Sequence, residues 1–299
     1  MDVLVTGAKG QLGRDLVGRL EAAGLVVAAR GSSELDVTDR GRVSGAVKEA
    51  APQVVINCAA YTAVDRAEAE RDRAFEVNAA GARNLALAAR ESRAALIHIS
   101  TDFVFDGARP EPYTELDPPR PLGVYGASKL AGEREIERAL DEHVIVRASW
   151  LYGSAGGGNF VKTILGLAAE RERLRVVYDQ TGSPTWTGDL ADALVAVTMR
   201  IGRGGGRAPY GTYHYSNEGV ASWYDLAVAA IEGARGLGAE LRCASVEPIR
   251  TSEYPTPAAR PAYSVLDKGK IKETFGVAIP HWRASLGKML AELYPEKIQ

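Results

Sequence analysis

Cysteine is scarce in this chain of 299 residues, which has only Cys58 and Cys243. Two cysteines cannot form the disulfide framework of small secreted domains, so we expect both to be reduced, in a cytoplasmic protein. Long apolar runs are missing too: no stretch approaches the roughly 20 residues that span a bilayer. The N-terminus enters a strand pattern at once, with no basic leader before it. The sequence therefore predicts neither a membrane protein nor a secreted one.

An excess of charge of either sign is also absent. The 36 Lys and Arg residues nearly balance the 38 Asp and Glu residues, which leaves a net charge of -2. Such a chain has no field that gathers nucleic acid or an anionic membrane surface, so we expect neither as a partner. The apolar share of 46% is ordinary for a globular protein, and the length allows one large α/β unit or two domains.

The chain opens with a strand, a glycine turn and a helix. The apolar run Asp2 to Thr6 leads into Gly7-Ala8-Lys9-Gly10-Gln11-Leu12-Gly13, and a helical pattern follows. In such a unit Gly7 permits the tight turn, Gly10 lets the backbone approach a pyrophosphate, and Gly13 lets the helix pack on the strand. The helix amides then face the phosphates. The pattern predicts dinucleotide binding.

Four more apolar runs alternate with helical patterns, at residues 25–29, 53–57, 96–99 and 143–147. Strands that alternate with helices predict a doubly wound parallel sheet, that is, an α/β (Rossmann) fold. After Gly153 short elements and Pro-rich turns replace this regular alternation. We therefore predict a second, smaller α/β substrate-binding domain.

We assign residues 1–148 to the dinucleotide-binding domain, with the chain re-entering it at roughly 172–194 and 220–234. The substrate-binding domain then comprises residues 149–171, 195–219 and 235–299.

The end of the second strand bears on the choice of cofactor. Arg30 and two serines stand where an acidic residue would hold the ribose 2′-hydroxyl of NAD, and arginine suits a 2′-phosphate instead. Glu34 and Asp36 follow closely, and Arg30 could also be a solvated strand end. We expect NADPH, with tolerance for NADH.

Tyr125 and Lys129 are four residues apart, which on a helix places both side chains on one face. A lysine held close to a phenol favours tyrosinate, so we expect Lys129 to lower the pKa of Tyr125 toward the range of acid–base work. Alone, such a pair is more often simply a solvated helix start, and only the rest of the chain favours the catalytic reading. His98 alternates within a strand and is predicted to be a core histidine. Asn78 is either a polar anchor or a surface residue.

Several motifs together resemble the extended short-chain dehydrogenase/reductase family. The glycine turn, Ser100-Thr101-Asp102 at a strand end and the Tyr125/Lys129 pair occur in the family's order. Further resembling stretches are residues 57–65, 100–107, 124–133, 179–185 and 254–261. The resemblance spans nearly the whole chain and points within the family to reductases of dTDP-linked deoxysugars.

The resemblance implies reduction of the C4 ketone of dTDP-4-dehydro-6-deoxy-L-mannose, giving dTDP-L-rhamnose. Tyr125 would donate the proton, Lys129 would support Tyr125 and bind the cofactor ribose, and Thr101 would hydrogen-bond the ketone. The substrate contacts implied are Thr62, Thr101, Asp102, Phe103, Trp150 and Arg260. Arg260 suits the diphosphate, although it could be a surface arginine, and Trp150 could be a core aromatic.

The resemblance also implies the cofactor site. It comprises Gly7, Gly10, Gln11, Leu12, Gly13, Arg30, Asp36, Val37, Ala59, Ala60, Tyr61, Tyr125 and Lys129. Of these, Asp36 and Val37 resemble the adenine-binding pair of the fold.

The sequence also bears on whether subunits assemble through a metal ion. Some family members join subunits through Mg²⁺ held by carboxylates, and Asp15 and Glu292 match two of those positions. The third is Gly188, with Asp189 one step out of register. We therefore predict no metal site, while the resemblance leaves room for a homodimer.

Two other functions fit parts of the pattern. A sugar-nucleotide epimerase or dehydratase would keep the fold and retain NAD⁺, but the family's dehydratases place an acidic pair after the threonine. Here Asp102 is followed by Phe103, so the second acid is missing. A non-catalytic regulatory subunit, of the kind that serves methionine adenosyltransferase, would need none of the intact reactive residues.

Overall fold

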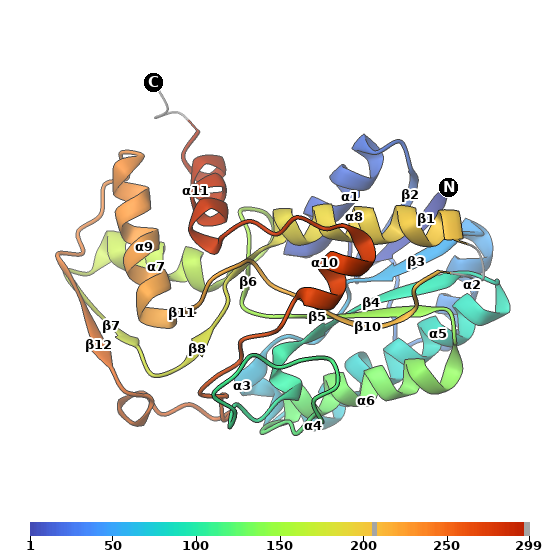
Figure 1. The fold of residues 1–299 in the computed structure, drawn as a ribbon, viewed down its shortest axis with the longest axis horizontal. Coiled ribbons are helices and arrows are strands. Elements are labelled where there is room, and N and C mark those ends of the chain that lie inside the picture. Colours follow the sequence, from blue (N-terminus) through green and yellow to red (C-terminus); the bar gives the residue numbers. More distant parts are fainter. Residues whose placement is uncertain (205–207, 296–299) are drawn as a thin grey trace.

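A computed structural model describes residues 1–204 and 208–295 and divides into two lobes (Figure 1). The larger lobe holds a parallel sheet between two layers of helices. The smaller lobe consists of short strands and helices. No helix in the described part of the chain is long and apolar enough to cross a membrane.

Six strands form the sheet of the larger lobe, in the order β10-β5-β4-β3-β1-β2, and all neighbours are parallel. They are β1 (Asp2–Thr6), β2 (Val26–Arg30), β3 (Val54–Asn57), β4 (Ala95–Thr101), β5 (His143–Ala148) and β10 (Gly211–Tyr215). The first five match the predicted strands. Registers place Thr6 beside Asn57 and Asn57 beside His98, so three polar side chains meet near the carboxyl ends of the strands.

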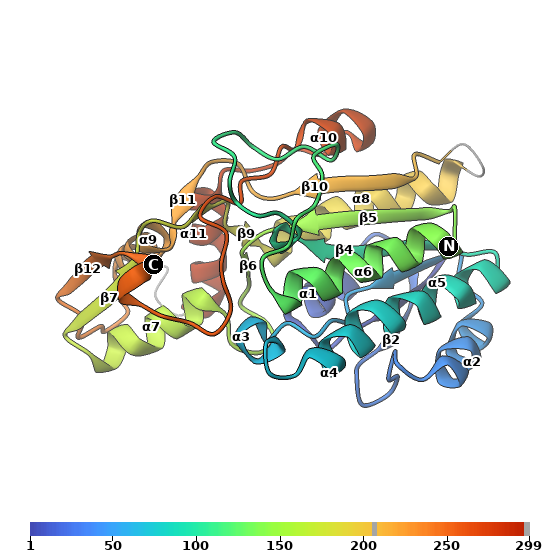
Figure 2. The same ribbon diagram turned by 90° about the horizontal axis from the view of Figure 1, so that it is seen from below.

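Helices cover both faces of the sheet, because alternate strand residues are apolar on each side. Val3 and Val5 pack with α1 (Gln11–Ala22) and α8 (Thr187–Gly204). Leu4 packs on the other face with α2 (Arg40–Ala50), α5 (Gly81–Glu91) and α6 (Val124–Ala139). In Figure 2, α5 and α6 lie side by side along the sheet. The predicted doubly wound α/β fold is confirmed.

Short helical turns lie at the carboxyl edge of the sheet. After β3 the chain forms α3 (Val64–Ala67), α4 (Arg71–Phe75) and the π-helical turn η1 (Glu76–Ala80), which runs into α5. After β4 it forms the 3-10 turn η2 (Asp102–Val104). The η2 turn carries two of the predicted site residues, Asp102 and Phe103.

The smaller lobe has its own core, in which Trp186, Leu226, Trp282 and Met289 are buried together. Its elements are β6 (Leu151–Tyr152), α7 (Phe160–Glu170), β7 (Arg173–Val177), β8 (Thr181–Gly182), β9 (Thr185–Trp186), β11 (Ala221–Ser222), α9 (Trp223–Gly236), β12 (Ser245–Ile249), η4 (Thr251–Glu253) and α11 (Trp282–Leu293). The helix α10 (Gly269–Phe275), which was predicted in the second domain, packs instead on β10 and α8 of the larger lobe. The central piece is a parallel β7–β12 pair beneath α7 and α9.

The returning segment of the chain differs from the prediction. Residues 195–219 were expected in the substrate-binding domain, yet α8 packs on α1 and β10 completes the large sheet. Residues 172–194 and 220–234 were expected to re-enter the large lobe, yet they include β7 and most of α9, which belong to the small one. The polar, short β10 gave no strong strand signal. We keep the two-domain division as a proposal, with α8 and β10 as the returning segment; residues 296–299 of the predicted second domain lie outside the described chain.

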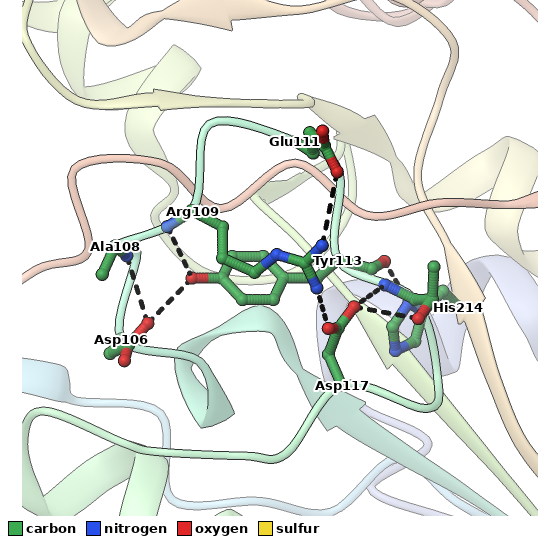
Figure 3. Close-up of polar contacts among 8 residues, drawn as sticks. Asp106, Ala108, Arg109, Glu111, Tyr113, Asp117 and His214 are labelled. Carbon is green, nitrogen blue, oxygen red and sulfur yellow. Dashed lines mark hydrogen bonds and ion pairs between the residues drawn. The ribbon is translucent and has the colours of Figure 1, made fainter.

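The loop between η2 and α6 is tied down by polar contacts (Figure 3). Its Tyr113 hydroxyl donates to Asp106 at 2.8 Å, and Arg109 forms an ion pair with Asp117. The Tyr113 carbonyl lies 3.0 Å from Nδ1 of His214, on β10. The loop that follows the predicted catalytic strand is therefore attached to the edge of the sheet.

Candidate active site

A cleft of about 630 Å³ lies between the two lobes. Eight of the predicted site residues line it: Gln11, Thr62, Thr101, Asp102, Phe103, Tyr125, Trp150 and Arg260. The large lobe contributes the ends of β4 and α6, and the small lobe contributes α7, α9 and residues 254–260. Most of the other predicted residues lie on the glycine turn, the ends of β2 and β3, and the loop after β3.

The glycine turn has the close packing that a dinucleotide site needs. Gly7 has a φ of +66°, and a Cβ there would lie 2.5 Å from the amide nitrogen of Ala59. A Cβ on Gly13 would lie 2.3 Å from the Gly7 carbonyl oxygen. Gly10 precedes α1 and caps it with no side chain, so the first helix amides are left for a phosphate. Leu12 is buried in the core and offers only its backbone. The turn fits a pyrophosphate.

At the end of β2, the Arg30 guanidinium has only weak contacts, while the Asp36 carboxylate is engaged in a turn with Thr38. Arg30 donates to the preceding carbonyl at 3.2 Å and has a long contact of 3.9 Å to Glu49. Asp36 accepts from the backbone and hydroxyl of Thr38, which holds the pKa of Asp36 below its usual value. Val37 is buried. The Arg30 guanidinium is thus the more available group for a 2′-phosphate.

Asn78 connects the loop after β3 to α6. Its side chain accepts from the Tyr61 amide at 2.9 Å and donates to the Tyr61 carbonyl at 3.1 Å and to Ser128 Oγ at 2.9 Å. Of the two possibilities left open for Asn78, the polar anchor is correct. Ala59, Ala60 and Tyr61 are half-buried along this loop, while Thr62 is exposed at the cleft rim. The π-helical turn that carries Asn78 is a feature often found at functional sites.

Thr101 and Tyr125 meet in the cleft. Thr101 ends β4, Tyr125 lies in the first turn of α6, and both line the cleft. The Thr101 hydroxyl donates to Asp102 Oδ1 at 3.1 Å and accepts from the Phe103 amide at 3.2 Å. Burial raises the pKa of Tyr125 to about 12, and the nearby Asp102 carboxyl adds to the rise. The expected lowering by Lys129 is not found, because the Lys129 amine points to the Ile99 carbonyl, 2.6 Å away. At neutral pH the phenol is therefore protonated.

Lys129 is buried one turn further along α6. Burial lowers its pKa to about 8, opposed by the charges of Glu133 and Cys58. The Glu133 carboxylate is itself held by a buried ion pair with Arg147 at 2.7 Å and by Ser100 Oγ at 2.5 Å. The lysine is thus fixed beneath the cleft rather than exposed in it.

Asp102 and Phe103 flank the Thr101–Tyr125 pair. Burial raises the pKa of Asp102 to about 7, opposed by hydrogen bonds from Ser264 and Thr101. The Phe103 ring meets the Tyr125 ring edge to face, with centroids 5.6 Å apart. An apolar ring therefore occupies the place beside Asp102 where a second acid would be required for elimination.

The opposite wall of the cleft is aromatic. The indoles of Trp150 and Trp223 are parallel, with centroids 3.5 Å apart, and the Phe160 ring lies 4.5 Å from Trp223. Trp150 has a φ of +50°, a conformation uncommon for a non-glycine residue. Trp223 donates from Nε1 to Gln180 at 3.1 Å. The sequence missed Phe160 and Trp223; Gln180 lies in one of the resembling stretches.

Arg260 lies in the cleft wall but is already engaged. Its guanidinium donates two hydrogen bonds to Asp65, of 3.0 and 2.8 Å, and one to Thr256 Oγ1 of 2.6 Å. This pairing lowers the pKa of Asp65. A diphosphate would have to share the guanidinium with Asp65 or displace it.

The carboxylates considered for Mg²⁺ have other partners. Asp15 accepts from Thr187 at 2.5 Å, and Glu292 accepts from Ser154. Asp189 is buried and accepts from Asn217 at 2.7 Å. Within residues 1–204 and 208–295, no group of three His, Cys, Asp or Glu side chains is arranged to hold a metal ion.

Known proteins resemble the chain over almost its whole length. A family model described as RmlD substrate binding domain matches residues 1–294. A dTDP-4-dehydrorhamnose reductase from Streptomyces griseus is 47% identical, covering 95% of this chain and 91% of its own. Crystal structures of dTDP-4-dehydrorhamnose reductases give TM-scores of 0.90 (Clostridium acetobutylicum, 40% identity, 98% of this chain and 99% of that one) and 0.89 (Bacillus anthracis, solved with NADP, 41% identity, 97% and 98%).

Proposed function

The chain belongs to the RmlD substrate binding domain family, and we propose that it reduces the C4 ketone of dTDP-4-dehydro-6-deoxy-L-mannose to dTDP-L-rhamnose with NADPH. The observation that carries this proposal is that Thr101 and Tyr125 both line the cleft, with Lys129 buried one turn further along α6. The family model, which matches residues 1–294, supports the same reading of these three residues.

NADPH fits the turn after β1. The tight Gly7 and Gly13 contacts and the uncapped start of α1 suit its pyrophosphate, and Arg30 suits its 2′-phosphate. Bound NADPH would supply the hydride. Ala59, Ala60 and Tyr61 would form the edge on which the cofactor lies, held in place through Asn78.

In this proposal the proton comes from Tyr125. Because its pKa is raised to about 12, the phenol carries its proton at neutral pH and can give it to the alkoxide formed at C4. Thr101, which lines the cleft together with that phenol, would orient the ketone oxygen. Lys129 would support the phenol from below and contact the cofactor ribose.

The rest of the cleft would hold the sugar nucleotide. We assign Thr62, Asp102, Phe103 and Trp150 to the sugar, and Arg260 to the diphosphate. Asp102 has a pKa of about 7, so near neutral pH its carboxyl both donates and accepts hydrogen bonds. With Phe103 at the second acid position, elimination is disfavoured and simple reduction is favoured.

The test uses the purified full chain with NADPH and dTDP-4-dehydro-6-deoxy-L-mannose. We expect loss of NADPH absorbance and a product whose NMR coupling constants at C4 identify dTDP-L-rhamnose. Consumption of neither NADPH nor NADH would overturn the proposal. Tightly bound NAD⁺ in the purified protein, with no net consumption of reduced cofactor, would indicate an epimerase or dehydratase instead.

Two further expectations belong to the proposal. A cytoplasmic location fits a chain in which both Cys58 and Cys243 are free thiols. A homodimer is the assembly for which the family resemblance leaves room. Sedimentation velocity over a range of concentrations, with and without EDTA, tests the dimer. A monomer at all concentrations would exclude it, and EDTA-sensitive association would point to a metal between subunits.

A further inference from the structure

A chain of buried polar side chains runs beneath the cleft, from the glycine-turn strand to the predicted catalytic lysine. It consists of Thr6, Asn57, His98 and Lys129, each at most 2% exposed. Thr6 Oγ1 lies 2.7 Å from Asn57 Oδ1, and Asn57 Nδ2 lies 2.9 Å from His98 Nδ1. His98 Nε2 lies 3.2 Å from Lys129 Nζ. None of the roles assigned above uses Asn57 or His98.

The backbone fixes which way the Asn57 amide faces. The amide nitrogen of Ala59 can only donate, and it lies 3.0 Å from Asn57 Oδ1. Turning the side chain over would set two donors against each other there. Asn57 Nδ2 therefore faces His98 and donates to Nδ1, so Nδ1 must carry the lone pair.

This assignment determines the state of the imidazole. Burial holds the pKa of His98 well below its usual value, and the charge of Lys129 acts in the same direction, so the ring is neutral. A neutral ring that accepts at Nδ1 carries its proton on Nε2. That N–H points at Lys129 Nζ, so the contact is a hydrogen bond only when the lysine is an amine, the form that predominates above its pKa of about 8. Nζ keeps its own N–H for the Ile99 carbonyl, at 2.6 Å.

We propose that His98 is a positioning residue for Lys129: its Nε2–H donates to the Lys129 amine, and Asn57 sets that tautomer from the backbone of Ala59. The catalytic use of this contact rests on the proposed function. In that function Lys129 supports Tyr125, so we expect the balance between the ammonium and amine forms of Lys129 to set the basic limb of the pH profile. The amine is the form that accepts from His98.

The other groups around Lys129 do not replace His98 in this role. Glu133, on the same helix, favours the charged lysine, but Arg147 and Ser100 hold its carboxylate. Cys58, after β3, acts weakly in the same sense as Glu133. His143, at the start of β5, adds only to the lowering of the pKa of His98. Tyr125 is the remaining titratable neighbour on α6.

The experiment is ¹⁵N NMR of the histidine rings in the full chain, without substrate, for wild type and Asn57→Asp. In wild type we expect His98 to be neutral with the proton on Nε2. In Asn57→Asp the new carboxylate accepts from His98, so the proton should move to Nδ1, leaving Nε2 to accept from an ammonium. His98→Gln assigns the signals, and His281→Gln, at an exposed helix cap, is the control.

A proton on Nδ1 in wild type, an imidazolium near neutral pH, or no change of tautomer in Asn57→Asp would each overturn the proposal. A second readout follows turnover: the basic limb of the kcat–pH profile should move up by about one unit in Asn57→Asp. If the basic limb of the kcat–pH profile is unchanged in Asn57→Asp, the tautomer of His98 does not act on Lys129. Because the tautomer is measured without substrate, its failure is distinguishable from a failure of the proposed reaction.

Discussion

The two walls of the cleft are built in different ways. The sheet wall carries Thr101 and Tyr125, with Lys129 buried behind them, and Thr101 and Lys129 are held by hydrogen bonds to the backbone. The small-lobe wall carries Trp150, Trp223 and Phe160, which are held by ring packing. A wall fixed by directional hydrogen bonds can place a proton to within a fraction of an ångström, whereas stacked rings give contact area with less directional control. We therefore assign chemistry to the first wall and binding to the second.

We expect the largest loss of activity from a substitution at Tyr125. Tyr125→Phe keeps the ring that packs on Phe103 but removes the proton donor, so kcat should fall by about 10²–10⁴ with little change in KM. Steady-state kinetics with NADPH tests this. Tyr178→Phe, at an exposed tyrosine outside the cleft lining, is the control and should keep full activity. Near-normal turnover in Tyr125→Phe would contradict the assignment of chemistry to the sheet wall.

The next largest effect concerns the buried ion pair behind that wall. Glu133→Gln leaves the Arg147 guanidinium without its charged partner, which should lower the free energy of unfolding by about 3–5 kcal/mol. Glu135→Gln, two residues further along α6, breaks only solvent-facing pairs and should cost about 0–1 kcal/mol. Urea denaturation measures both. If both variants lose the same free energy of unfolding, the Glu133–Arg147 pair does not specifically stabilise the sheet wall.

A pH effect should come from Asp102. Its folded pKa, about 7, lies above the unfolded value near 4, so the folded state binds more protons between those limits. Stability is then fullest below about pH 4 and falls as the pH rises through 7, by about 2 kcal/mol between pH 5 and 7. Asp102→Asn should remove this contribution. Urea denaturation of both proteins at the two pH values tests it, and parallel pH profiles would contradict it.

The smallest effect is expected on the aromatic wall. Trp223→Ala removes the partner of Trp150, and a stacked pair contributes about 0.5–1.5 kcal/mol, so KM for the sugar nucleotide should rise about two- to tenfold. The kcat value should stay near that of wild type. Trp223→Phe, which keeps an aromatic ring, should change KM less. A large loss of kcat in Trp223→Ala would contradict the assignment of binding to the aromatic wall and of chemistry to the sheet wall.

The sequence predicted the sheet wall better than the aromatic wall, for a physical reason. Strand, turn and helix signals are local, so they located β1 to β5, the glycine turn and the Tyr125/Lys129 pair. The stacking of Trp150 on Trp223 joins positions far apart in the chain, and no spacing rule relates them. Trp223 and Phe160 were therefore missed, and β10 was assigned to the wrong lobe.

Local rules also failed where burial outweighed proximity. The spacing of Tyr125 and Lys129 suggested a lowered phenol pKa, but in the structure the amine faces Ile99 and His98, and burial raises that pKa. Similarly, alternation alone identified His98 as a core residue, which is correct, but could not show that both ring nitrogens have polar partners. The polar partners of the His98 ring nitrogens depend on how neighbouring strands are aligned, and this register cannot be predicted from the sequence pattern alone.

The position of β10 has a consequence for how the chain folds during synthesis. β10 pairs with β5 along its length and forms the outer strand of the sheet, but it begins about 60 residues after β5 ends. At ribosomal rates of about 5–20 residues per second, the β5 edge stays open for roughly 3–12 s. An open strand edge is a template for pairing with other chains. The β5 edge of the nascent large lobe is therefore open to pairing with other chains until β10 has been made.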